Sequence, residues 1–348
     1  MKWLPVILSM LFTIQLTAQD CDKTVLAQKP GTWKAGIPGS PAFVTPADLS
    51  KEKLVLAGIH KMISTSYAPQ GCQALYTNSF GGSAPVSGKN WIGDHFTYRI
   101  YVLRYLCDKQ SADKSKYYVD VSTPTTVTVS INEIPNLNTL YAADLPDDEF
   151  RGYLKLPRFP QKKDGYYFMG EEVVGDSHLE NKIKTYSWLI TYDDKLPFKY
   201  VSRKEYLLIQ KKRLEKTIQE NGGSSFYDKY VNNITEALKK PESELSRPAI
   251  CIWNDEELFN GFVEEGVNGS FIAVKPNLDY YNKKLSKSVP QFFSVVFKIS
   301  HGDPVFEANI DAIKKSVDFA ALRTMLGKEG VKTVAETKPV KQKGVVTK

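Results

Sequence analysis

The fold prediction starts from residues 95–107, HFTYRIYVLRYLC, in which aromatic and β-branched residues dominate. Such residues favour a β-strand. Residues 108–116 are polar and predict a turn, and residues 117–131 (YYVDVSTPTTVTVSI) resume the strand pattern, with Pro124 marking an edge or a break. In this second stretch Val127, Val129 and Ile131 alternate with Thr126, Thr128 and Ser130. The alternation predicts a strand with one apolar and one polar face.

The flanking sequence adds a helix and further strands. Residues 46–67 open with proline at the first turn and predict a helix with an apolar stripe of Leu49, Leu56, Ile59 and Ile63. Residues 165–169 and 184–192 predict two more strands, the second with Tyr186, Trp188, Ile190 and Tyr192 on one face. One helix followed by several antiparallel strands predicts an α+β fold, in which the helix packs on an antiparallel sheet built within residues 95–192.

The C-terminal part of the chain is predicted to be a helix-rich α+β region. Residues 202–221 form the clearest helix, with a capping box from Ser202 and Glu205 and a double glycine at its end. A second helix covers residues 225–239, and Asp303 caps a third that Pro304 opens. Strands are predicted at residues 249–253, 270–275 and 291–300. We therefore divide the chain into a signal peptide (1–19), an N-terminal α+β domain (20–195), a C-terminal α+β region (196–327) and a disordered basic tail (328–348).

The first residues of the chain have the pattern of an export signal. Lys2 precedes a mainly apolar stretch of 14 residues, 3–16 (WLPVILSMLFTIQL), which is too short to span a bilayer, and cleavage is expected after Ala18 or Gln19. A buried N-terminal helix is the alternative. Because no later run of about 18 apolar residues follows, the mature chain is expected to carry no transmembrane segment and to reside in the periplasm or outside the cell.

Export makes disulfide bonds possible for the four cysteines, Cys21, Cys72, Cys107 and Cys251. Four cysteines allow three pairings, and the sequence does not choose among them. Our preference is Cys21–Cys72, because both lie in irregular Gly/Pro-rich sequence; four buried thiols are the alternative. No two cysteines lie two to four residues apart, which disfavours a zinc site.

Charge and composition exclude several classes of protein. The chain has 348 residues, 42% of them hydrophobic, and a formal charge of +7. These values rule out a collagen, a wholly disordered chain and a polytopic membrane protein. Much of the charge lies in residues 328–348, which hold six lysines and two glutamates. This tail is predicted either to act only as a solubilising segment or to make weak contact with an anionic surface. Nucleic acid is not an expected partner, because the body has no dense basic stripe.

No motif in the sequence predicts a reaction. There is no Gly-x-Ser-x-Gly, no His-Glu-x-x-His, no EF-hand loop and no Gly-rich phosphate loop. His60, His95, His178 and His301 are scattered, and the acidic stretches 144–149, 171–172 and 255–257 predict solvated loops. Cys72, in PQGCQALY, superficially resembles a peptidase cysteine, but a disulfide is favoured. We therefore predict no catalytic residues, no metal and no cofactor.

Two residues are candidates for a binding surface. Trp91 lies in a Gly/Ser-rich loop that precedes the strand at 95–107, and loops of this kind often carry function. His95 directly follows Asp94, which can orient its imidazole.

Three segments resemble a broad group of uncharacterised exported proteins of Bacteroidetes-type bacteria. They are residues 30–34 (PGTWK), 196–207 (LPFKYVSRKEYL) and 290–297 (PQFFSVVF). The resemblance spans most of the mature chain and implies an exported α+β protein of a Gram-negative envelope. It implies no activity and no catalytic residues.

These observations leave two functional hypotheses. The first is an exported, non-catalytic binding or structural module of the bacterial envelope, whose ligand is a protein, a peptide or a glycan. The second is a secreted hydrolase whose site assembles from distant groups such as His95, His301 and the acidic loops. The absence of catalytic motifs favours the first.

Overall fold

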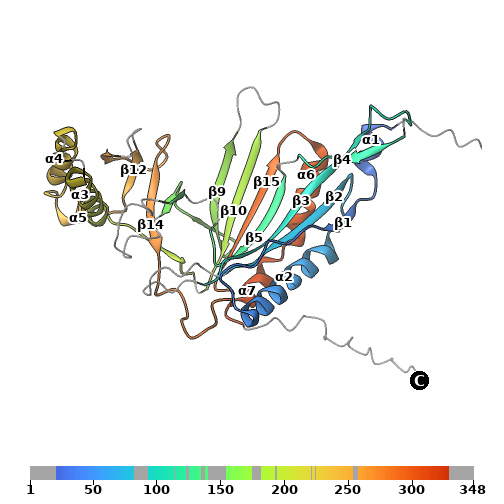
Figure 1. Ribbon diagram of the computed structural model, residues 1–348, viewed down its shortest axis with the longest axis horizontal. Helices are drawn as coiled ribbons and strands as arrows, with labels where there is room; N and C mark the ends of the chain where they lie inside the picture. The colour runs from blue at the N-terminus through green and yellow to red at the C-terminus, as the bar shows by residue number, and fades with distance from the viewer. Residues whose placement is uncertain are drawn as a thin grey trace, which may run out of the picture.

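Two β-sheets, each with helices of its own, make up the computed structural model (Figure 1). The structure describes residues 21–81, 93–113, 115–122, 125–134, 138–139, 154–174, 182–192, 194–220, 222–223, 225–253 and 258–328. The predicted signal peptide, Trp91, His178 and residues 329–348 of the predicted tail lie outside these residues. Within the described residues, none of the helices has the length and apolar character that crossing a membrane requires.

The larger sheet contains the strand predicted at residues 95–107. Its strands, in spatial order, are β1 (Thr32–Ala35), β2 (Cys72–Ser79), β3 (Phe96–Cys107), β5 (Thr126–Ile131), β15 (Phe293–Ser300), β10 (Ile183–Ile190), β9 (Tyr166–Val174) and β8 (Gln161–Lys163), with β4 (Tyr117–Val119) paired to β3. All neighbouring pairs are antiparallel except β1 and β2, which are parallel. The predicted strands at 95–107 and 184–192 are confirmed.

Three helices cover one face of this sheet (Figure 1): α2 (Pro46–Ser66), α6 (Pro304–Ser316) and α7 (Phe319–Met325). Pro46 occupies the first turn of α2 and Asp303 caps α6, as their sequences predict, and the Thr45 side chain caps α2. The core beneath them joins Leu56 and Ile59 of α2 to the alternate, apolar residues of the strands, such as Ile100 and Val129. The predicted α+β fold, with a helix packed on an antiparallel sheet, is therefore confirmed.

The smaller sheet carries the helix-rich part of the chain. Its strands, in order, are β13 (Phe259–Phe262), β12 (Ile250–Trp253), β14 (Phe271–Pro276), β7 (Leu154–Leu156) and β6 (Asn138–Thr139), with β11 (Phe198–Tyr200) paired to β14. Its helical segments are α3 (Arg203–Glu220), the 3₁₀ turn η2 (Ser225–Tyr227), α4 (Asp228–Ala237) and α5 (Glu242–Leu245). The Ser202 hydroxyl accepts a hydrogen bond from the Glu205 amide at 3.1 Å, which is the predicted cap of α3.

The two sheets do not divide the chain at the predicted boundary between residues 195 and 196. β15, α6 and α7 come from the C-terminal part, yet β15 pairs between β5 and β10 in the larger sheet. Conversely, β6 and β7 precede the boundary and belong to the smaller sheet. Strand pairing between segments more than 100 residues apart leaves no local mark in the sequence.

A disulfide is present, as predicted, but the preferred partner was wrong. Cys21 is bonded to Cys107, and Cys72 and Cys251 are buried free cysteines. Cys21 precedes the short helix α1 (Lys23–Gln28), which packs against β3 and so lies beside the end of that strand, where Cys107 sits. Cys72 instead points into the core, where its sulfur lies 3.8 Å from the Tyr67 hydroxyl. Alternation along β2, rather than irregular sequence, decides the environment of Cys72.

Candidate functional site

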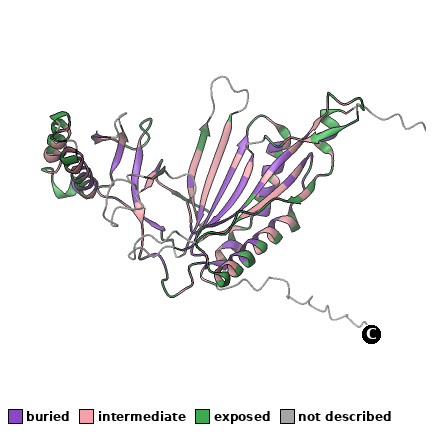
Figure 2. Ribbon diagram, viewed as in Figure 1, coloured by how far each residue is buried: buried purple, intermediate pink, exposed green. Residues whose placement is uncertain are grey.

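The face of the larger sheet opposite the helices is rich in hydroxyl groups. Phe96, Tyr98 and Ile100 of β3 pack toward the helices, so the residues between them point to the other face. Register pairs the open-face residues into rows across neighbouring strands: Thr97, Ser130 and Ser294 in one row, and Arg99, Thr128, Val296 and Ser187 in the next. Thr97, Thr128, Ser130 and Ser294 are buried despite their polarity. Figure 2 shows buried residues along the central strands of this sheet.

These hydroxyls make some contacts within the sheet. The hydroxyls of Thr97 and Ser130 lie 3.4 Å apart, and Arg99 donates from Nε to the Thr128 hydroxyl at 3.2 Å. A hydroxyl group both donates and accepts hydrogen bonds. The four buried hydroxyls therefore belong to the packing of the sheet, whereas the hydroxyls of Thr185 and Ser187 on β10 are only half-buried and can meet a ligand.

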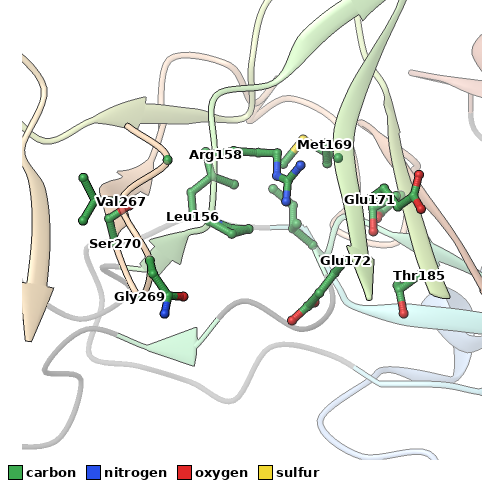
Figure 3. Close-up of a pocket in the computed structure, with 16 residues that line it drawn as sticks. Leu156, Arg158, Met169, Glu171, Glu172, Thr185, Val267, Gly269 and Ser270 are labelled. Atoms are coloured by element: carbon green, nitrogen blue, oxygen red, sulfur yellow. The ribbon is translucent and has the colours of Figure 1, made fainter. Parts of the chain in front are cut away.

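A cavity of about 450 Å³ opens where this face meets the smaller sheet (Figure 3). Thr185, Ser187 and Ser294 line it from β10 and β15, and Met169 lines it from β9. Leu156 of β7 and residues 266–270, which connect β13 to β14, form the opposite side. The volume lies within the range of small-molecule sites, and the mixture of apolar walls with a few polar groups is typical of them.

Arg158 is the cationic group of this cavity, and Gly170 makes room for it. β9 and β10 slip in register between Ser187 and Trp188, and Gly170 sits at this bulge with φ of +119°. A Cβ atom at Gly170 would lie 2.4 Å from Cδ of Arg158, so the arginine side chain crosses the strand where a larger residue would collide with it. Glycine is favoured at this position by its backbone angle, since the exposed arginine side chain could move away from a Cβ atom.

Two glutamates of β9 adjoin the arginine but differ in their surroundings. Glu171 lies 3.9 Å from the Lys184 ammonium, which offsets its charge. Glu172 pairs in register with Thr185 and lines the same cavity as Arg158. Arg158 and Glu172 make no hydrogen bond or ion pair with any residue that the structure describes. The cavity therefore presents one cation and one anion that no described residue pairs.

His95 lies near this site but lines a different cavity. It is exposed at the start of β3, beside a space of about 250 Å³ that Asn132, Glu133 and Phe292 also line. Ile134 borders both cavities. Asn132 fixes the local loop, because its side-chain amide donates to the carbonyls of Asp94 and Val289. The other predicted binding residue, Trp91, lies outside the described residues.

The structure does not bring the remaining histidines to His95. His301 follows β15 and sits 2.6 Å from the Glu307 carboxylate, whereas His95 lies beyond the opposite end of the same row of strands. The eight residues of β15 between these levels correspond to about 26 Å. His60 packs against Tyr76 and Trp33 and shares a 2.8 Å hydrogen bond with the Tyr98 hydroxyl. Burial lowers the pKa of His60, so it serves as a neutral core residue.

The free cysteines are placed in the core. Burial raises the pKa of the Cys72 thiol to about 11 and that of the Cys251 thiol to about 12. A thiol is nucleophilic as its thiolate, which these environments disfavour. Within the described residues, no group of three or more His, Cys, Asp or Glu side chains is arranged to hold a metal ion.

Sequence reasoning missed a buried carboxyl group on α2. Glu52 is fully buried; Oε2 accepts a hydrogen bond from the Gly81 amide at 3.3 Å, and Oε1 has no partner. Burial, and then the neighbouring charges of Asp94 and Asp48, raise the pKa of Glu52 to about 8. The available signal was its position three residues after Leu49, on the apolar stripe of the helix.

Arg158, Gly170 and Ser187 were also missed, because three separate parts of the chain bring them together. No family model, curated protein or solved structure matches the chain.

Proposed function

We propose that this chain is an exported, non-catalytic binding module of a bacterial envelope, which takes its ligand in the cavity between the two sheets. The observation that carries the proposal is the cavity itself, whose lining combines the half-buried hydroxyl groups of Thr185, Ser187 and Ser270 with the guanidinium of Arg158. Such a surface suits a polar ligand, and among proteins, peptides and glycans it favours a glycan.

The Cys21–Cys107 disulfide supports export, because disulfides persist in oxidising compartments. The N-terminal sequence, with Lys2 before a mainly apolar stretch of 14 residues, supports the same compartment. The described histidines and cysteines support binding rather than catalysis, since His95 and His301 lie far apart and both free thiols are buried.

Affinity electrophoresis through gels that contain neutral or acidic polysaccharides tests the proposal. The wild-type protein is expected to be retarded by at least one polysaccharide and to release no new reducing ends from it. A Ser187→Trp variant, which fills the cavity, is expected to migrate as in a gel without polysaccharide. Arg99→Trp, on the same face of the sheet but three strands from Ser187 and not lining the cavity, serves as the control.

Retardation of the Ser187→Trp variant equal to that of the wild type would contradict binding in the cavity. Release of reducing ends by the wild type would favour the hydrolase instead.

A further inference from the structure

We infer that the cavity recognises the carboxylate of an acidic sugar, such as a uronic acid residue of a glycan, through the guanidinium of Arg158. The inference rests on the proposed function and specifies its ligand. It follows from two features: an arginine that the described residues leave unpaired, and a wall with short hydroxyl groups.

The arginine reaches the cavity across β9. Its side chain lies over Gly170, where the bulge in β9 and the missing Cβ leave room for it. In Figure 3, Arg158 extends across the cavity toward β9. A guanidinium presents a planar set of donors that matches a carboxylate in bidentate fashion, and such charge-assisted hydrogen bonds are stronger than neutral ones.

The remaining lining suits a sugar. Thr185, Ser187 and Ser270 supply short hydroxyl groups, and each can donate to or accept from a sugar hydroxyl. Among the described residues, β8 pairs with β9 only at residues 166–168, so residues 169–172 of β9 form a strand edge beside the cavity. A peptide that adds to this edge is the competing ligand.

The charges around the cavity determine whether each substitution is expected to strengthen or to weaken the binding of an anionic ligand. Glu171 is offset by Lys184, whereas Glu172 faces the cavity unpaired and repels an anionic ligand. Arg158 and Glu172 should therefore affect the affinity for a carboxylate in opposite directions. A neutral ligand of the same shape should respond to neither change.

Isothermal titration with trigalacturonic acid, and with its fully methyl-esterified form as the uncharged control, tests the inference. Arg158→Gln is expected to weaken binding of the acid by roughly 10- to 100-fold, the effect of one charge-assisted hydrogen bond. Arg158→Lys is expected to restore part of the loss, because it returns the charge without the bidentate geometry. Glu172→Gln is expected to strengthen binding roughly two- to fivefold.

Arg99→Gln is the matched control. Arg99 lies on the same open face and in the same row as Ser187, three strands or about 14 Å away, and does not line the cavity. Its replacement is expected to leave the affinity within about twofold of wild type.

Equal affinity of wild type and Arg158→Gln for the acid would overturn the inference, as would equal affinity of the wild type for the acid and its ester. Failure of the wild type to bind either form would overturn it too. In each case retardation by a neutral polysaccharide, abolished by Ser187→Trp, would leave the proposed function standing. If Ser187→Trp does not affect retardation, the proposed function itself fails.

Discussion

The two faces of the larger sheet are made by alternate residues of the same strands, yet one face is mainly apolar and the other carries many polar side chains. On the covered face, Phe96, Val129 and Phe297 are buried against α2, α6 and α7. On the open face, Thr97, Thr128 and Lys298 occupy the neighbouring positions. Burial of apolar area is the main source of folding free energy, so the covered face is expected to hold the stability of the fold. The open face is polar at these positions, but where it meets the smaller sheet it holds a second buried apolar cluster that includes Leu189.

This division has one consequence for function. An unpaired cation is costly to bury but inexpensive beside an open cavity, so Arg158 can remain without a partner only on the open side. On the covered side, Glu52 departs from the apolar character of its surroundings. Its carboxyl group is fully buried and has a raised pKa. The predictions below compare the two faces, from the largest expected effect to the smallest.

Adjacent residues of β15 give the sharpest contrast. Phe297 is 2% exposed within the covered core, whereas Lys298 points to the open face. Phe297→Ala is expected to lower the free energy of unfolding by about 3–5 kcal/mol, because it leaves a cavity in a packed core. Lys298→Ala is expected to change it by less than about 0.5 kcal/mol. Urea denaturation measures both, and similar effects of the two substitutions would contradict the division.

The disulfide fastens α1 to the end of β3, at the border of the covered core. The paired replacement Cys21→Ser with Cys107→Ser is expected to lower the free energy of unfolding by roughly 2–4 kcal/mol. Reducing agent should shift the thermal midpoint of the wild type but not that of the variant. Thiol titration of the unfolded, unreduced protein should find two thiols, from Cys72 and Cys251. Four thiols would show that the bond does not form.

The buried carboxyl group of Glu52, on the covered side, is expected to make the stability of the protein depend on pH. Its pKa is raised in the folded state to about 8, against 4.5 for an unperturbed glutamate, so the unfolded chain loses this proton first as the pH rises. Its contribution to stability is therefore fully present below about pH 4.5 and is lost by about pH 8. Glu52→Gln is expected to raise the free energy of unfolding at pH 8 by roughly 1–3 kcal/mol and to leave it nearly unchanged at pH 4. A gain that does not depend on pH would show that Glu52 stays ionised in the folded protein.

The hydroxyl groups of the open face are expected to matter least for stability. Thr185→Val together with Ser187→Ala should change the free energy of unfolding by less than about 1 kcal/mol, because both residues are only half-buried. The same variant should bind trigalacturonic acid several-fold more weakly than the wild type. A variant that is strongly destabilised would assign these hydroxyls to the fold instead of the ligand.

The sequence predicted what alternation and capping can reveal. The pattern of Val127, Val129 and Ile131 located the covered face, and the caps at Ser202 and Asp303 located two helices. The fold class followed from the order of helix and strands. These signals are local, and local patterns survive in a sequence read without relatives.

The site could not be predicted in the same way. The insertion of β15 between β5 and β10, and the approach of Arg158 to Gly170, join segments whose contact no local pattern encodes. The same reason explains the wrong partner for Cys21, since the pairing depends on where α1 packs. Gly170 was visible as a glycine inside a strand-like stretch, which is a known sign of a bulge or of a close approach.

Hydrogen exchange of the wild-type protein, measured by mass spectrometry with and without trigalacturonic acid, tests the central claim most directly. The claim is that the covered face stabilises the fold and the open face binds the ligand. We expect the acid to slow exchange in β9, in β10 and at residues 266–270, and to leave α2, α6 and α7 unchanged. Protection confined to those helices, or no protection anywhere at a saturating concentration of the acid, would contradict the claim.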